Sequence, residues 1–268
     1  MSVERRLTLT TMKSWTMNSQ SGFAADWPAP GNVRTLLTTR LGGVSRGAYS
    51  SMNLGQHVGD DPLAVAANRQ QLTDMLAACS AGSPVWLNQV HGTRVVDAAA
   101  LVGNRAPEAD ASFARAAGVV CAVMTADCLP VLFCDASGTV VAAAHAGWRG
   151  LLAGVLEEAV AAMGVPGEDV IACLGPAIGP QAFEVGDEVR SAFVEVDEHA
   201  AQAFKTSVAG KWLADIYWLA RQRLQRKGVT SVYGGMQCTY DEADRFFSYR
   251  RDGQTGRMAS LIWLDRPE

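Results

Sequence analysis

Apolar and polar positions along the chain predict short strands mixed with helices. The segment from Val33 to Thr39 is rich in β-branched residues and predicts a strand. It runs into a polar, glycine-rich segment from Leu41 to Gly47, which predicts a loop. Pro62 opens a stretch whose apolar residues recur at helical spacing through Leu76, and proline is favoured in the first turn of a helix. A helix is therefore predicted after this loop.

The middle of the chain is dense in predicted strands. Runs of apolar and β-branched residues predict four of them: Val85 to Val90, Val119 to Thr125, Leu129 to Cys134 and Thr139 to His145. Asp135-Ala136-Ser137-Gly138 predicts a hairpin turn between the last two. Short strands joined by turns favour antiparallel pairing.

The second half of the chain returns to a mixture of elements. Apolar spacing predicts a helix from Leu151 to Met163, which ends at Gly164. Further patterns predict helices over Asp187 to Val196 and Lys211 to Lys227, and strands over Val170 to Leu174, Val229 to Gly234 and Met258 to Leu264. Because no regular βαβ repeat is present, the fold class is predicted as α+β rather than a doubly wound α/β sheet.

Length and composition favour one large domain. The chain has 268 residues, of which 49% are hydrophobic and 19% charged, so it can bury a full core. The polar segment 1–27 is predicted to be an N-terminal leader or edge segment, and residues 28–268 a single catalytic domain. No internal repeat divides the chain.

Charge and cysteine usage narrow the classes of partner. The 23 Lys and Arg against 27 Asp and Glu give a net charge of −4, and no basic run could follow a phosphate backbone. No apolar stretch reaches the roughly 18 to 20 residues of a membrane span, and the N-terminus lacks a signal-peptide pattern. Six cysteines are too sparse for a disulfide scaffold. We therefore expect a cytoplasmic protein without nucleic-acid or membrane partners.

Two histidines and one cysteine carry the strongest candidate chemistry. His91 and His145 end strand-like runs, and Cys128 lies in a polar interruption between two apolar strands. Together they have the composition of a catalytic zinc site with an open fourth position. Cys128 follows His91 by 37 residues and precedes His145 by 17, which matches no local zinc motif, so the fold must bring them together.

Two alternatives stay open on the residues alone. Cys128 is also explained as a core residue, with each histidine capping a strand by hydrogen bonding. It is equally explained as the thiolate nucleophile of a Cys-His hydrolase, with His145 or His91 as base and glycine-rich turns as oxyanion donors.

Two arginines are candidate anion holders. Arg46 lies in the glycine-rich loop, whose backbone N–H groups suit an anion, and Arg149 lies just before the predicted helix at Leu151. The plain alternatives are a hairpin loop and a helix start with Trp148 buried in the core.

The motifs form an ordered set that resembles the bacterial laccase-domain family, described as polyphenol oxidase, peptidoglycan editing factor and multifunctional purine nucleoside enzyme. The resemblance spans about residues 25 to 264, and its motifs are Thr38-Thr39-Arg40, Gly42-Gly43-Val44-Ser45, Asn53-Leu54-Gly55, His57-Val58-Gly59-Asp60-Asp61-Pro62, Asn88-Gln89-Val90-His91-Gly92, Ala109-Asp110-Ala111, Thr125-Ala126-Asp127-Cys128, His145-Ala146-Gly147-Trp148-Arg149-Gly150, Leu174-Gly175-Pro176-Ala177-Ile178-Gly179-Pro180 and Phe247-Ser248-Tyr249-Arg250-Arg251-Asp252. It implies a single α/β/β/α layered domain with mixed, largely antiparallel sheets. It also implies that His91, Cys128 and His145 bind zinc.

The resemblance further implies phosphorolysis of adenosine, inosine and methylthioadenosine, and deamination of adenosine. The small-molecule partners would then be a purine nucleoside and phosphate. The protein is expected to be a monomer or a small homo-oligomer. Within that activity, Asp127 is the expected proton carrier beside Cys128. Arg46 and Arg149 are the expected phosphate holders, and Asn53 and Gln89 are expected to bond ribose or base.

Two other activities attach to the same residues. A multicopper oxidase needs on the order of ten imidazoles for its copper centres, and this chain has four histidines. A single copper at His91, Cys128 and His145 would still suit weak polyphenol oxidation, so copper is the alternative metal. Hydrolytic editing of a peptidoglycan precursor would instead use Cys128 as nucleophile.

Overall fold

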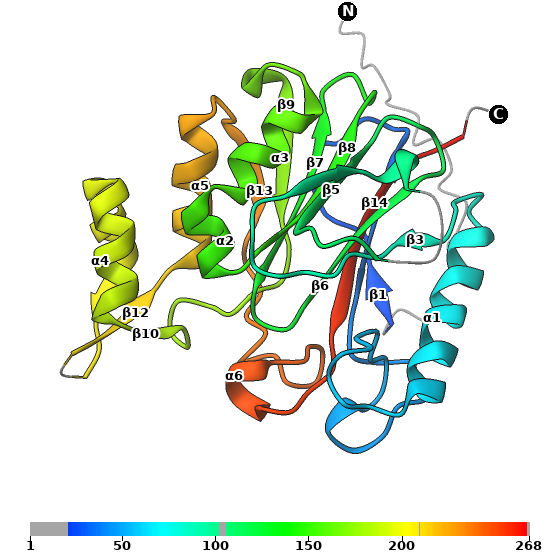
Figure 1. Cartoon of the computed structure of the whole chain (residues 1–268), viewed down its shortest axis with the longest axis horizontal. Helices are drawn as coiled ribbons and strands as arrows, with labels where there is room; N and C mark the ends of the chain where they lie inside the picture. Colours follow the sequence, from blue (N-terminus) through cyan, green and yellow to red (C-terminus); the bar gives the residue numbers. More distant parts are fainter. Residues whose placement is uncertain (1–20, 102–105, 209, 267–268) are drawn as a thin grey trace, which may run out of the picture.

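Two β-sheets packed face to face form the centre of the computed structural model, which describes residues 21–101, 106–208 and 210–266 (Figure 1). The five-stranded sheet has the order β1 (Gly22–Phe23), β2 (Val33–Thr38), β14 (Met258–Leu264), β6 (Val120–Thr125) and β3 (Pro84–Val85). The six-stranded sheet has the order β13 (Ser231–Gly234), β9 (Val170–Leu174), β7 (Leu129–Asp135), β8 (Val141–Ala146), β5 (Ala111–Ala114) and β4 (Val95–Asp97).

Strand alternation divides the side chains between two layers of core. On β7, Val131 and Phe133 face the helices outside the six-stranded sheet, whereas Leu132 and Cys134 face the other sheet. The same period of two on β14 sends Ile262 between the sheets and the flanking residues outward. Both strands are buried along their whole length, which explains why their sequences are continuous apolar runs.

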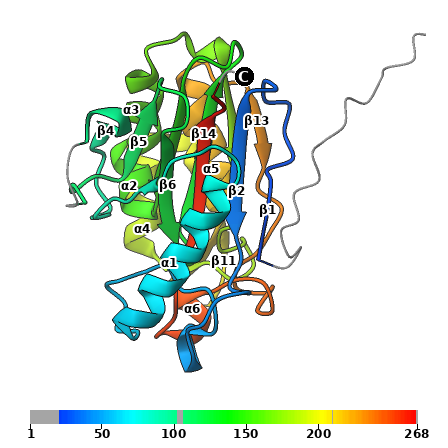
Figure 2. The same ribbon diagram turned by 90° about the vertical axis from the view of Figure 1, so that its right-hand side faces the viewer.

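Helices cover the two outer faces. Helix α1 (Pro62–Ala77) packs on the five-stranded sheet, as Figure 2 shows, and Asp61 caps its N-terminus by accepting from the backbone N–H of Leu63. Helices α2 (Trp148–Ala153), α3 (Val155–Met163) and α5 (Ile216–Arg226) cover the six-stranded sheet. The predicted α/β/β/α layering is confirmed.

The pairing is mixed and mostly antiparallel, as predicted. The β7–β8 hairpin is antiparallel with Pro130 opposite His145, and parallel pairs occur at β3–β6, β4–β5 and β9–β13. A small third sheet of β10 (Glu184–Gly186), β12 (Lys211–Ala214) and β11 (Phe204–Thr206) lies at one side with helix α4 (Asp187–Val196). Shorter turns of helix are η1 (Gly47–Tyr49), η2 (Ala98–Ala100), η3 (Gly167–Asp169), η4 (Glu198–Ala203) and α6 (Tyr249–Asp252).

Two predicted helices differ from the structure. The helix expected over 151–163 is interrupted at Gly154, whose φ of +105° takes the backbone out of the helical region and separates α2 from α3. The helix expected over 211–227 begins only at Ile216, because Asp215 caps it by accepting from the Trp218 N–H. The preceding residues form strand β12.

The strand predicted over 85–90 was also wrong beyond its start. After β3 the chain leaves the sheet, and the side chain of Gln89 takes over the role of a strand partner. Its amide nitrogen donates to the Met124 carbonyl at 2.8 Å, and its amide oxygen accepts from the Met124 N–H at 2.7 Å. The Gln89 side chain thus bonds the backbone groups of β6 that the predicted strand would have bonded.

The predicted leader lies only partly within the described residues. Residues 1–20 lie outside them, and β1 pairs antiparallel with β2 at the edge of the five-stranded sheet. Within the described ranges, no helix is both long and apolar enough to cross a membrane.

Candidate metal centre

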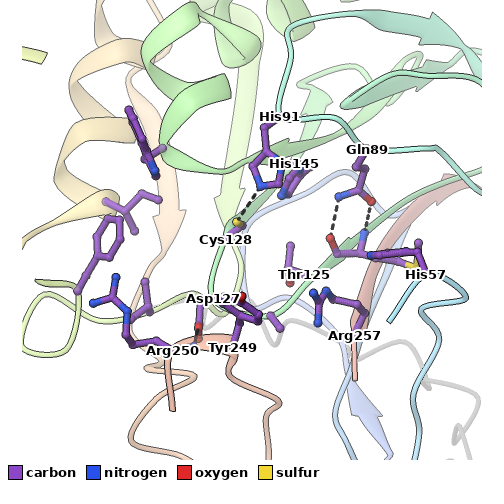
Figure 3. Close-up of a pocket in the computed structure, with 16 residues that line it drawn as sticks. His57, Gln89, His91, Thr125, Asp127, Cys128, His145, Tyr249, Arg250 and Arg257 are labelled. Atoms are coloured by element: carbon purple, nitrogen blue, oxygen red, sulfur yellow. Dashed lines mark hydrogen bonds between the residues drawn. The ribbon is translucent and has the colours of Figure 1, made fainter. Parts of the chain in front are cut away.

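Cys128 lies in the short connection from β6 to β7, where the chain passes from one sheet to the other. His145 is on β8, the neighbour of β7, and His91 is in the loop that follows β3. The three side chains, far apart in the sequence, meet at one end of the two sheets (Figure 3). The structure therefore brings together the three residues predicted to bind a metal.

The geometry of this cluster could hold a metal ion. One ligand atom from each residue lies within 4.8 Å of the others, and the His91 Nε2 and Cys128 Sγ atoms are 3.7 Å apart. Tetrahedral zinc with ordinary Zn–S and Zn–N bonds separates such atoms by about 3.6 Å. Gly147 permits this approach, because a Cβ there would stand 2.5 Å from the His91 ring. Since His91 is exposed and Cys128 half-buried, one side of the cluster stays accessible.

Asp110 holds both histidines in place. Its Oδ1 atom lies 2.8 Å from His145 Nδ1, so the other ring nitrogen of His145 is left for a metal. The same carboxylate accepts from the backbone N–H groups of His91 and Gly92, at 3.0 and 2.7 Å. Asp110 is completely buried. Burial favours its neutral form, but the contacts with His145 and the backbone outweigh burial and lower its pKa.

Cys128 and His145 form a coupled pair of opposite charge. Burial opposes ionisation of the thiol, but the charge and hydrogen bond of His145, together with His91, lower the pKa of Cys128 to about 6. Burial likewise opposes the charged imidazole, but the Cys128 thiolate and Asp110 raise the pKa of His145 to about 9. A thiolate is the form of cysteine that both binds metals and attacks electrophiles.

The cluster opens into a cavity of about 430 Å³. This volume falls in the range of small-molecule sites. The apolar lining residues include Trp148, Ile178, Phe183 and Ile216, which pack in one hydrophobic cluster and which we call the apolar wall. Other lining residues are polar or cationic: His57, Gln89, Thr125, Asp127, Tyr249, Arg250 and Arg257 (Figure 3).

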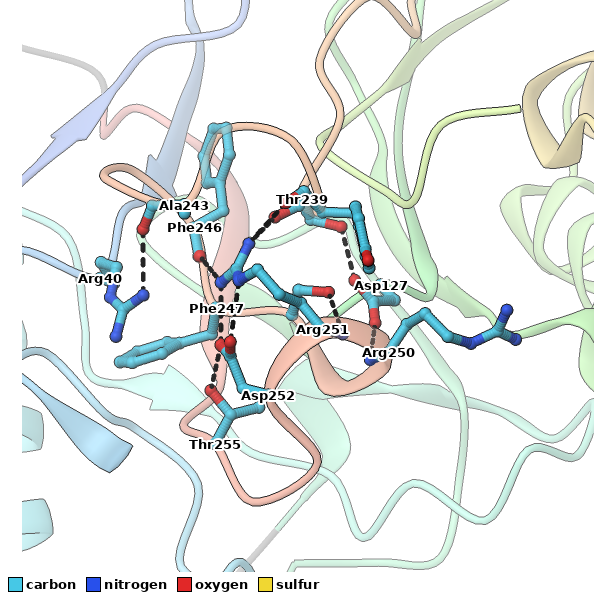
Figure 4. Close-up of polar contacts among 12 residues, drawn as sticks. Arg40, Asp127, Thr239, Ala243, Phe246, Phe247, Arg250, Arg251, Asp252 and Thr255 are labelled. Carbon is cyan, nitrogen blue, oxygen red and sulfur yellow. Dashed lines mark hydrogen bonds and ion pairs between the residues drawn. The ribbon is translucent and has the colours of Figure 1, made fainter. Parts of the chain in front are cut away.

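Asp127, the residue before Cys128, is bonded to a later segment of the chain that also lines the cavity. Its two carboxylate oxygens accept from the Thr239 hydroxyl and from the Arg250 backbone N–H, each at 2.6 Å (Figure 4). Arg251 fastens the same segment, because its guanidinium donates to the carbonyls of Thr239 and Phe246 and pairs with Asp252. We call residues 238–252 the strap. The strap places Tyr249 and Arg250 on the lining of the cavity.

Comparison with known proteins identifies the family. Residues 34–265 match the family model described as multi-copper polyphenol oxidoreductase laccase. The chain belongs to this laccase-like family. The resemblance drawn from the sequence motifs is confirmed.

Relatives within this family carry a different kind of name. A protein of Pseudomonas aeruginosa named purine nucleoside phosphorylase is 57% identical over 240 residues, covering 89% of this chain and 96% of its own. YfiH of Escherichia coli, also named purine nucleoside phosphorylase, is 56% identical with the same coverage. A crystal structure from Neisseria meningitidis is 58% identical with a TM-score of 0.88, covering 92% of this chain and 100% of its own. YlmD from Geobacillus stearothermophilus superposes with a TM-score of 0.79 at 31% identity, covering 88% of this chain and 93% of its own.

The remaining predicted site residues of this laccase-like chain are distributed unevenly. Gln89 lines the cavity, but its amide is bonded to Met124. Asn53 is fully buried and bonded to the backbone of Gly55 and Arg257, away from the cavity lining. Arg46 and Arg149 are exposed and do not line the cavity. The structure therefore does not bring the two predicted phosphate-holding arginines to the metal cluster.

Four residues near the site received no role from the sequence. Asp110, His57 and Arg250 lie inside motifs that carry the family resemblance, so the motifs contained a signal without indicating a function. Arg257 lies outside these motifs, at the start of β14. Only the folded chain shows that its side chain reaches the cavity.

Proposed function

We propose that this protein is a zinc-dependent purine nucleoside enzyme that catalyses phosphorolysis of adenosine, inosine and methylthioadenosine and deamination of adenosine. The observation that carries the proposal is the cavity itself, where an accessible His-Cys-His cluster faces an apolar wall and two arginines. The names of the relatives from Pseudomonas aeruginosa and Escherichia coli support phosphorolysis.

The donor set supports zinc as the resident metal, with copper as the alternative. Two imidazoles and a thiolate are borderline-soft ligands that leave a position open. His91, Cys128 and His145 would hold the ion, and Asp110 would orient the imidazoles. Bound zinc would supply Lewis acidity for the hydrolytic loss of the amino group of adenosine.

The cavity walls suggest how the nucleoside lies. The flat purine ring suits the apolar wall that includes Trp148 and Phe183, beside the cluster. Ribose and phosphate suit the polar and cationic residues of the remaining lining. This arrangement would keep the base beside the cluster and the charged co-substrate near arginine.

The role of Asp127 is better described as positioning than as proton transfer. It is the one carboxylate among the described residues that line the cavity, yet both of its oxygens accept hydrogen bonds from the strap. A carboxylate engaged in this way keeps the strap against the Cys128 connection. We therefore propose that Asp127 supports the binding surface of Tyr249 and Arg250.

The test combines metal analysis with product analysis. Protein purified without added metal is assayed for zinc and copper, and adenosine turnover is followed with and without phosphate. We expect zinc near one per chain, adenine and ribose 1-phosphate in phosphate, and inosine without it. Cys128→Ala should lose metal and both reactions, whereas Cys79→Ala, a half-buried cysteine outside the cavity, should keep them. Metal-free protein without nucleoside turnover would contradict the proposal.

One observation favours a second candidate, a cysteine hydrolase acting on a peptidoglycan precursor. Cys128, His145 and Asp110 stand in the order nucleophile, base and orienting carboxylate. The metalloenzyme and the cysteine hydrolase differ in how readily the Cys128 thiol reacts with an alkylating agent. A zinc-bound Cys128 should resist alkylation until a chelator is added, while a free nucleophile should be alkylated at once and its hydrolase activity lost.

Three further expectations remain predictions. Copper loading should give at most weak phenol oxidation, because the described chain brings together one His₂Cys cluster rather than several. A cytoplasmic location and a monomeric or small homo-oligomeric state follow from the sequence analysis alone. Fractionation of cells and light scattering test them.

A further inference from the structure

We propose that Arg257, assisted by His57, forms the binding site for the inorganic phosphate co-substrate, opposite the metal cluster; this inference rests on the proposed phosphorolysis. Both residues line the cavity. In Figure 3 the guanidinium of Arg257 points into the cavity toward Thr125. The ligand class is a tetrahedral oxyanion, which a guanidinium binds with two parallel hydrogen bonds.

The Arg257 guanidinium has hydrogen-bond donors that are not used within the described residues. Its Nη1 atom donates to the carbonyls of Thr255 and Gly256 at 3.1 and 3.0 Å. Over the described ranges, its Nε and Nη2 atoms have no hydrogen bond and its guanidinium has no ion pair with a carboxylate. By contrast, Arg251 pairs with Asp252 and the buried Arg223 pairs with Glu157. An anion in the cavity would supply the missing partner.

The chain builds a cradle for this arginine. Asn53 accepts from the Arg257 backbone N–H at 2.9 Å, and the Leu54 N–H donates to the Arg257 carbonyl. At Gly55 a Cβ would stand 2.8 Å from Arg257 Cγ, so only glycine lets the side chain lie where it does. The Asn53-Leu54-Gly55 motif, predicted to contact ribose or base through Asn53, instead fixes the position of Arg257.

A histidine and a second arginine lie near the same place. Burial and the charges of Arg257 and Arg69 lower the pKa of His57. Arg69 lies behind, donating to the Leu54 carbonyl and stacking on Trp86 at 4.2 Å. Burial lowers the pKa of Arg69 to about 10, and burial also lowers that of Arg257. Two guanidinium groups thus lie near one imidazole, and together they would attract an anion.

The position suits phosphorolysis. Arg257 and the three residues of the metal cluster line one cavity, so the guanidinium and the cluster share the same volume. A phosphate held there would lie at the polar end and a purine at the apolar wall. The ribosyl carbon attacked by phosphate would then lie between them.

The decisive experiment measures phosphate binding and two activities in the same variants. Inorganic phosphate is titrated by calorimetry, the KM for phosphate is measured in phosphorolysis, and phosphate-free deamination of adenosine is measured in parallel. For Arg257→Gln we expect phosphate affinity to fall and the phosphate KM to rise by about 30-fold, with a much smaller fall in deamination. Melting temperature and zinc content verify that each variant is folded.

Additional variants separate this site from its competitors. Gly55→Ala keeps the guanidinium but displaces it, so it should also raise the phosphate KM. Arg34→Gln, a surface arginine paired with Asp265, is the matched control and should change nothing. A selective loss of phosphate binding in Arg46→Ala, with none in Arg257→Gln, would overturn the proposal in favour of the glycine-rich loop. An equal loss of phosphorolysis and deamination in Arg257→Gln would also overturn it.

The two proposals fail in different ways. If the wild type binds phosphate in an Arg257-dependent manner but turns over no nucleoside, the phosphate site stands and the proposed function falls. If nucleosides are phosphorolysed with an unchanged phosphate KM in Arg257→Gln, the function stands and the phosphate site falls. No phosphate binding to the wild type, with or without nucleoside, overturns the site.

Discussion

The two sides of the cavity are built by different means. In the metal cluster, His145 is on β8 and Cys128 directly precedes β7, the strand that pairs with β8, so backbone pairing helps to fix these two residues. The buried Asp110 carboxylate bonds both His145 and the loop of His91. The opposite side consists of loops around His57 and Arg257 and of the strap. These loops are held by side-chain hydrogen bonds from Asn53, Asp127 and Arg251.

The difference teaches where precision and adaptability lie. A sheet fixes the separation of side chains on and beside its strands, which suits ligands that must lie within tenths of an ångström of one ion. A loop needs specific polar contacts to hold one conformation, and those contacts can be weakened singly. We therefore expect changes on the sheet side to act through the metal and changes on the loop side to act through substrate affinity.

The largest effect is expected at the cluster itself. Cys128→Ala should lower metal affinity by more than about 100-fold, because even the outer partners of metal ligands contribute about 10 to 100-fold. Nucleoside turnover should be lost with the metal. Metal analysis by mass spectrometry after dialysis checks this, and full metal retention would show that Cys128 is not a ligand.

Asp110→Asn is expected to come next. The Asp110 carboxylate accepts from the His91 and Gly92 N–H groups, and an amide NH₂ facing either donor cannot accept. Metal affinity should fall by about 10 to 100-fold. Competition with a chelator measures it, and Asp97→Asn, at an exposed turn, is the control. Unchanged metal affinity would show that Asp110 does not orient the histidines for metal binding.

Alkylation of metal-free protein tests the charge of Cys128. Because its pKa is lowered to about 6, the thiolate persists at neutral pH and disappears as the pH falls below about 6. At pH 7 the thiolate fraction should exceed that of an ordinary thiol by about 30-fold. Iodoacetamide rates from pH 5 to 9 give the midpoint, and Cys79 and Cys238, with raised pKa, are internal controls. A midpoint near 9 would contradict the ion pair with His145.

Loosening the strap should have a moderate effect confined to substrate binding. Thr239→Val removes the hydroxyl that donates to Asp127 and leaves one carboxylate oxygen unpartnered by the strap. Loss of one such bond contributes about 1 kcal/mol, so the nucleoside KM should rise by about fivefold while zinc content stays constant. Steady-state kinetics and metal analysis test this, with the exposed Thr206→Val as control. Loss of zinc would show that the strap supports the cluster.

The smallest effect is expected at Arg149. Its guanidinium stacks on Trp148 at 4.3 Å from the ring centre, and the side chain is exposed outside the cavity. Arg149→Ala should change phosphorolysis and deamination by less than about twofold. A selective loss of phosphorolysis would support the predicted role of Arg149 in holding phosphate. It would also contradict the assignment of substrate binding to the loop side of the cavity.

Several elements were predictable because local signals decide them. The strands over 120–125, 129–135 and 258–264 are mostly apolar in sequence and buried along their whole length, and Pro62 sets the start of α1. Elements were misplaced where one residue overrides a pattern. Gly154 breaks an apolar helical repeat, and Asp215 begins a helix that the spacing alone starts earlier.

The amino-acid sequence alone established the kind of site, and the tertiary structure decided which other residues line it. The sequence indicated a soft-ligand cluster of His91, Cys128 and His145, because thiol and imidazole are ligands of borderline-soft metals and the family resemblance assigns all three residues to the metal. It could not place arginines, since an arginine side chain is long and its destination depends on which loops lie nearby. Only the folded structure shows that Arg46 lies outside the cavity and that Arg257, held by Asn53 and Gly55, lines it.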